Sequence, residues 1–188
     1  MSKTVEMLKK YSAYNEQEER DVDMIIEAEA LFGEILTRNN KFCHLTASAF
    51  VLNQAHTKVL CSYHNIYNSW TWVGGHADGD DDMLYVAKKE TVEETSIEKF
   101  KVLSEMPISV EILPVKGHVK RGKYVSAHLH LNVTYLFEAN ENDAIKIREG
   151  ENSNVGWLTF DQLIEKSQEP YMIPVYKKII EKIKNGCF

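Results

Sequence analysis

Three glutamates near the middle of the chain, Glu90, Glu93 and Glu94, have the spacing of a metal-binding helix face. They fall at positions i, i+3 and i+4 of a helix predicted from about Met83 to Thr95, so all three carboxylates share one side. On a free helix their repulsion costs roughly 0.2–0.5 kcal/mol per pair. A bound divalent cation would reverse that cost, because Mg²⁺ and Mn²⁺ prefer carboxylate oxygen.

The same glutamates could instead form an ordinary solvated helix face, with Asp80, Asp81 and Asp82 capping the helix N-terminus. The glycine pair Gly74-Gly75 favours the metal site. Glycine lets the backbone run close to a ligand, and this pair stands directly ahead of the acidic loop and helix.

This combination resembles the Nudix box, the signature of the Nudix hydrolase family. The resemblance covers residues 75–97, and every metal-binding glutamate of the box is present. Asp81 and Lys89 keep the charge, but not the size, of the family's glutamate and arginine. Thr91 and Ser96 replace an aliphatic residue and a glycine. The matching positions are Gly75, Glu90, Glu93, Glu94 and Ile97.

These departures affect the residues that orient the loop and the helix more than they affect the metal-binding glutamates. A charge pair between Asp81 and Lys89 could survive with a different reach, but lysine lacks the planar fork of arginine and should orient its partner less firmly. Ser96 stands where the family has a helix-ending glycine, which puts the local C-cap in doubt. We expect the metal site itself to remain.

The resemblance implies hydrolysis of a diphosphate bond in a nucleoside diphosphate linked to another group. It implies Mg²⁺ as the cofactor, with Mn²⁺ as a possible substitute, because such an ion neutralises phosphate oxygens and lowers the pKa of a bound water. The implied metal ligands are Glu90, Glu93 and Glu94, together with the Gly74 carbonyl. Glu90 and Glu94 are the direct ligands that we expect first.

The general base has several candidates. Some Nudix hydrolases use a glutamate of the box, and others use a glutamate in a late loop before a tryptophan-bearing strand. Here Glu149 and Glu151 lie in such a loop ahead of Trp157, although a solvated charged loop explains them equally well. The predicted catalytic set is therefore Glu93, Glu94 and Glu151.

Three histidines are candidates for contact with the substrate. His128 and His130 lie on one face of a predicted strand, because side chains alternate, and His76 follows the box glycines. Two histidines on one face could bind a transition metal, but no third ligand is evident in the sequence. Lining of a substrate cavity, or hydrogen bonding in the core, is the favoured interpretation.

Basic and aromatic residues could help to bind a nucleotide. A cluster of positive charge on one predicted hairpin could attract phosphate, although a solvated tip is the simpler interpretation. Tyr63, Trp70 and Trp72 could stack on a base, yet aromatic residues in strands more often belong to the core. The basic residues of the hairpin are Lys116, Lys120, Arg121 and Lys123.

Strands with helices between them must position these residues. Their order predicts an α/β fold, a three-layer α/β/α sandwich with a mixed sheet, which the Nudix resemblance also implies. An N-terminal helix, capped by Asn15 with Glu18 in capping-box position, should run to about Thr37 and pack its apolar stripe on the domain or on a second subunit. The other predicted elements are a short helix around Leu8, strands at 44–52, 58–64, 70–73, 109–119, 125–137 and 156–158, and helices at 161–166 and 171–185.

The composition limits the class of protein and its partners. The net charge of −6 and the lack of a strongly basic tract argue against a nucleic-acid duplex as a partner. Residues 1–10 lack the apolar core of a signal peptide, and no apolar run approaches membrane length. Cys43, Cys61 and Cys187 lack metal-like spacing, so we expect reduced thiols in a cytoplasmic protein that binds no membrane.

The sequence thus predicts a helical extension at 1–40 and a Nudix-type hydrolase domain at 41–188. Its expected partner is a small-molecule nucleotide-diphosphate substrate, and the N-terminal helix could also build a homodimer. One alternative is a non-catalytic nucleotide-binding or regulatory protein on a Nudix fold, which has no evident need for three glutamates. Another is an isomerase of diphosphate esters, for which the sequence shows no motif.

Overall fold

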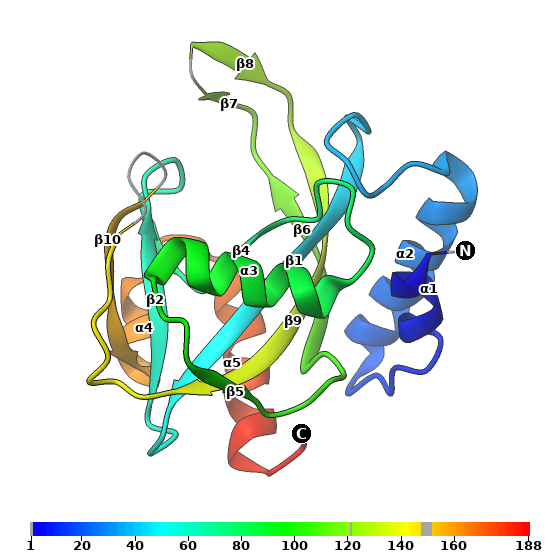
Figure 1. Cartoon of the computed structure of the whole chain (residues 1–188). Helices are drawn as coiled ribbons and strands as arrows, with labels where there is room; N and C mark the ends of the chain where they lie inside the picture. Colours follow the sequence, from blue (N-terminus) through cyan, green and yellow to red (C-terminus); the bar gives the residue numbers. More distant parts are fainter. Residues whose placement is uncertain (1, 121, 148–151) are drawn as a thin grey trace.

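The computed structural model describes residues 2–120, 122–147 and 152–188 and has helices on both faces of a mixed sheet (Figure 1). The predicted α/β/α architecture is therefore correct. Among the described residues, no helix is both long and apolar enough to cross a membrane. The helices are α1 (Lys3–Leu8), α2 (Glu16–Phe32), α3 (Met83–Thr95), α4 (Phe160–Lys166) and α5 (Met172–Lys184).

Two long parallel strands form the centre of the sheet. They pair along the whole length of the first, from Cys43 beside Leu129 to Asn53 beside Ala139. The strands are β1 (Cys43–Asn53), β2 (Lys58–His64), β3 (Ser69–Thr71), β4 (Val73–His76), β5 (Phe100–Val102), β6 (Ser109–Val115), β7 (His118–Lys120), β8 (Lys123–Val125), β9 (His128–Ala139) and β10 (Asn152–Thr159).

The main sheet has the order β10-β2-β1-β9-β5, while β3 pairs with β2, β4 with β1, and β6 with β9. Helix α3 covers one face, and α4 and α5 lie on the other (Figure 1). The hairpin of β7 and β8 projects from the body as a separate two-stranded ribbon (Figure 1).

Strand β1 serves both faces of the sheet because its side chains alternate. Leu45 and Val51 belong to the core on the α3 side, and Phe50 and Leu52 belong to the core on the α5 side. Earlier in the strand, the face that carries Phe50 has polar side chains, which line a cavity described below. These polar residues are His44, Thr46 and Ser48.

Several predicted boundaries were wrong. Helix α2 ends at Phe32, not near Thr37, because Gly33 adopts a left-handed conformation with φ of 69°. The predicted strand 70–73 is two strands, since β3 pairs with β2 whereas β4 pairs with β1. The strands predicted at 109–119 and 125–137 each divide, and their inner ends form the projecting ribbon. Strand β5 was not predicted.

The N-terminal helix packs on the body of the same chain through a buried charge network. The Glu18 carboxylate lies 2.9 Å from Lys178 Nζ and 3.2 Å from Lys182 Nζ, both on α5. Lys178 also contacts Glu111 of β6 at 2.9 Å. Asn15 caps the helix as predicted, but Glu18 accepts the N–H of Tyr14 and so does not complete a capping box.

The network keeps Glu18 charged although the residue is fully buried. Burial by itself raises the pKa of this carboxyl, but the Tyr14 N–H and Lys178 outweigh it and lower the pKa below its usual value. The outer side of α2 stays open to solvent, with Met24, Leu31 and Phe32 exposed. The homodimer through this helix therefore stays a prediction.

Replacing Glu18 with glutamine should lower the free energy of unfolding by about 3–5 kcal/mol, because two buried lysines lose a charged partner. Urea unfolding monitored by circular dichroism measures the change. Glu16→Gln is the matched control, since it removes only an exposed contact of 3.9 Å to Arg20. Equal effects of the two substitutions would show that the network does not anchor α2.

Replacing Ser96 with glycine should raise the free energy of unfolding by up to about 1 kcal/mol. Ser96 ends α3 in the left-handed conformation, with φ of 61°, and its N–H donates to the Val92 carbonyl at 2.8 Å. A glycine forms this cap without the clash of a Cβ atom. The same urea titration tests this; a loss of stability would contradict the account of the C-cap.

Candidate functional site

A cavity of about 690 Å³ lies between the acidic face of α3 and the polar residues of β1, β4 and β9. Its volume is within the range of small-molecule sites. It gathers most of the residues that the sequence singles out, from the box and from the predicted hairpin. Those lining it are Gly74, Gly75, His76, Lys89, Glu90, Glu93, Glu94, Lys120, His128 and His130.

The glycines of β4 permit a close contact between strand and helix. A Cβ atom on Gly75 would lie 2.5 Å from Glu90 Oε1 and 2.7 Å from Oε2, so any other residue would displace this carboxylate. The neighbouring Gly74 N–H donates to Glu94 Oε2 at 3.2 Å. The glycine pair therefore brings two carboxylates of α3 against the strand.

Both carboxylates are buried, and hydrogen bonds hold Glu94 in place. Glu90 is 8% exposed and Glu94 is 6% exposed. Asn152 of β10 donates from Nδ2 to Glu94 Oε1 at 3.2 Å, so Glu94 is oriented from two strands. Asn152 was not predicted, since only the pairing of β10 beside β2 brings it here. Two converging buried carboxylates are a suitable donor set for a hard divalent cation.

Glu93 differs from its two neighbours because it is exposed, at the rim of the cavity. Its carboxylate lies 3.8 Å from Lys89 Nζ, one helical turn earlier. Asp81 instead contacts Lys3 of α1 at 3.5 Å. Asp81 and Lys89 thus have ionic partners different from those that the sequence suggested, which paired the two residues with each other.

The late-loop candidates for a general base, Glu149 and Glu151, lie outside the described residues. Their predicted role stays a prediction. The strand that follows is β10, which carries Trp157 as expected.

Four histidines meet at the other side of the cavity. His128 and His130 do share one face of β9, as predicted. The approach of His44 to them and to His76 was not predicted. Register explains the grouping: His44 of β1 lies beside His130 of β9, and Thr46 of β1 lies beside His76 of β4. The ring of His44 is 5.1 Å from that of His76, 4.8 Å from that of His128 and 5.2 Å from that of His130.

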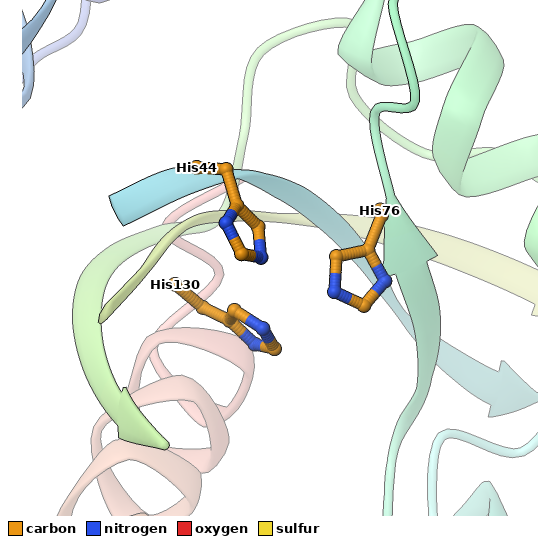
Figure 2. Close-up of side chains that lie close together, drawn as sticks. All are labelled: His44, His76 and His130. Atoms are coloured by element: carbon orange, nitrogen blue, oxygen red, sulfur yellow. The ribbon is translucent and has the colours of Figure 1, made fainter. Parts of the chain in front are cut away.

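The side chains of His44, His76 and His130 come from three neighbouring strands and face a common space (Figure 2). One ring nitrogen from each lies within 4.8 Å of the other two. Burial, together with the neighbouring His44, lowers the pKa of His76 to about 3. Burial and the neighbouring histidines hold the pKa of His130 well below its usual value. His76 and His130 are therefore neutral at physiological pH.

Side-chain hydrogen bonds link β1 to β9 at the cavity. The hydroxyls of Thr46 and Ser48 each donate to Asn132 Oδ1 at 2.9 Å. Asn132 Nδ2 in turn donates to Thr134 Oγ1 at 3.0 Å. These bonds lock β1 to β9 beneath the cavity.

The aromatic and basic candidates for nucleotide binding lie in different places: the core, the surface of the sheet and the cavity. Trp72 is 7% exposed and packs edge-on against Tyr176, so it belongs mainly to the core. Trp70 meets Tyr63 edge-on at 5.7 Å on the surface of the sheet. From the projecting ribbon, Lys120 and Tyr124 line the cavity, whereas Arg121 lies outside the described residues.

Comparison with known proteins agrees with this geometry. A family model described as NUDIX domain matches residues 43–182. An RNA pyrophosphohydrolase from Pelagibacter ubique (strain HTCC1062) is 30% identical over 124 residues, which are 64% of this chain and 77% of that protein.

Solved structures share the fold. A C. elegans Ap4A hydrolase in a binary complex superposes with a TM-score of 0.55 at 20% identity, over 75% of this chain and 98% of that one. The E. coli dihydroneopterin triphosphate pyrophosphohydrolase superposes with a TM-score of 0.54 at 12% identity, over 73% and 95%. The chain therefore belongs to the NUDIX family, as the sequence predicted, and is a Nudix-type pyrophosphohydrolase.

Proposed function

We propose that this enzyme hydrolyses a diphosphate bond in a nucleoside diphosphate linked to another group, and that it requires Mg²⁺ or Mn²⁺. The contact between Gly75 and the Glu90 carboxylate carries the proposal. The strand leaves room for a carboxylate where a Cβ atom would otherwise stand, within 2.7 Å of both its oxygens.

The donor set suits a hard cation. Glu90 and Glu94 would be the main ligands, with the Gly74 carbonyl beside them and Glu93 at the rim. Such an ion would neutralise phosphate oxygens and lower the pKa of the attacking water. The Gly74 N–H and the Asn152 amide hold Glu94 in one orientation before any ion binds.

We propose Glu93 as the general base because of its position in the cavity. Glu93 is exposed at the cavity rim, where it can take a proton from water, and Lys89 lies 3.8 Å away on the same helix face. Glu151 stays a candidate outside the described residues. His76, His128 and His130 line the part of the cavity away from α3 and are proposed to contact the substrate.

The choice of substrate rests on the shape and charge of the site. A cavity of about 690 Å³ suits a small nucleotide derivative, and Lys120 and Lys89 at its edge suit phosphate. The named relatives act on different molecules, an RNA among them, so their names support the class of reaction and not one substrate.

Gly75→Ala should lower metal-dependent turnover at least about 100-fold, because the added Cβ atom displaces the Glu90 carboxylate. Gly156→Ala is the matched control on another strand, where a Cβ atom would meet only the edge of Trp70 at 3.8 Å. Both variants are assayed for turnover and for thermal unfolding. If Gly75→Ala keeps full turnover, Glu90 is not a required ligand.

Glu93→Gln should lower turnover by about 10²–10⁴-fold while nucleotide affinity survives, because the loss of a general base affects the chemical step. Glu98→Gln, just beyond the helix, serves as the control. Initial rates and equilibrium nucleotide binding are measured on the same preparations. Unchanged turnover in Glu93→Gln would remove this residue from the catalytic set.

A further inference from the structure

The histidine cluster is a second candidate site in the cavity, separate from the carboxylates of α3. We propose that His44, His76 and His130 bind a transition-metal ion of the Zn²⁺ type through one ring nitrogen each. The geometry of the ring nitrogens, which all lie within 4.8 Å of one another, carries this inference.

The sheet itself builds the site. Strands β4, β1 and β9 are neighbours, and their register brings one histidine from each to the same face. Zn–N bonds of about 2.0–2.1 Å place two nitrogens of a tetrahedral site roughly 3.4 Å apart. Small rotations of the rings would reach this spacing, and the strands would not have to move.

One histidine is already oriented as a metal ligand. His44 Nδ1 lies 3.2 Å from the Asn40 carbonyl oxygen, which can only accept, so Nδ1 carries the proton and Nε2 keeps its lone pair. Histidine ligands commonly donate their other ring N–H to a backbone carbonyl in this way.

Two of these histidines also have a buried ring nitrogen that could bind a metal ion. His44 Nε2 and His130 Nε2 are buried, and neither has a hydrogen-bond partner among the residues that the structure describes. His44 is only 4% exposed. Leaving a buried polar atom unpaired costs free energy, and a bound metal ion would remove this cost.

Two other roles fit less well. Histidines could bind phosphate if they were protonated, but the ring centroids of His76, His128 and His130 lie only 4.8–5.2 Å from that of His44, so several charged rings would repel one another. Packing in the core is the other role, yet the cluster lines a cavity, and two of its nitrogens are unpaired within the described part of the chain.

The two donor sets differ in the ion that they prefer. Imidazole nitrogen suits Zn²⁺, Co²⁺ or Ni²⁺, whereas the carboxylates of α3 suit Mg²⁺. Three protein ligands leave one position of a tetrahedral ion open, as in catalytic zinc sites. Here that position would face the cavity, where it could take an oxygen of an anionic ligand.

The test measures Zn²⁺ bound per chain by equilibrium dialysis and elemental analysis, with excess Mg²⁺ present to occupy the carboxylates. The intact protein should bind one Zn²⁺. His130→Ala and His44→Ala should each weaken binding by more than about 100-fold, the upper end of the loss seen for outer-shell partners. His76→Asn should weaken binding in the same way. It replaces His44→Ala in the test if that buried variant fails to fold, which circular dichroism checks.

Controls separate this site from the others. His118→Ala removes another histidine that lines the cavity, and Cys187→Ser removes an exposed thiol; both should keep the zinc. Glu94→Gln should also keep it. The proposal is overturned if the intact protein binds no Zn²⁺, if the histidine variants retain it, or if Glu94→Gln loses it. Turnover with Mg²⁺ in zinc-free buffer tests the proposed function independently.

Discussion

The site depends on the close approach of a glycine-containing strand, β4, to the acidic helix α3. Gly75 has no side chain, and the Glu90 carboxylate occupies the space where one would lie. Gly74 adds an N–H that holds Glu94. Two carboxylates are thereby buried together at the wall of a cavity, which is costly for like charges, and the proposed divalent cation would offset this cost.

The rest of the fold keeps this contact in place. Strand β1 pairs with β4 on one side and with β9 on the other, so the glycine strand cannot shift without breaking the centre of the sheet. Below the cavity, Asn132 ties the hydroxyls of Thr46 and Ser48 together. Helix α2, which precedes the matched family region, is joined to α5 through Glu18.

The sequence predicted local structure well and long-range pairing poorly. The helix Met83–Thr95 and the strand Lys58–His64 were found at their observed bounds, because caps, turn residues and periodicity are local signals. The division of 70–73 into two strands was missed, since it depends on which distant strand each half meets. The meeting of His44 and His76 with His130 was missed for the same reason: it follows from the register of three strands. The grouping of Glu90 and Glu94 was predictable because both residues lie on one helix.

The most direct test is release of products from nucleoside diphosphate derivatives in the presence of Mg²⁺, Mn²⁺ or a chelator, for the intact protein and for Glu94→Gln. The account predicts that at least one derivative is hydrolysed, that the chelator stops the reaction, and that Glu94→Gln is inactive under all three conditions. Hydrolysis that survives the chelator would contradict the metal site. No hydrolysis of any derivative, with nucleotide binding intact, would instead indicate a binding protein.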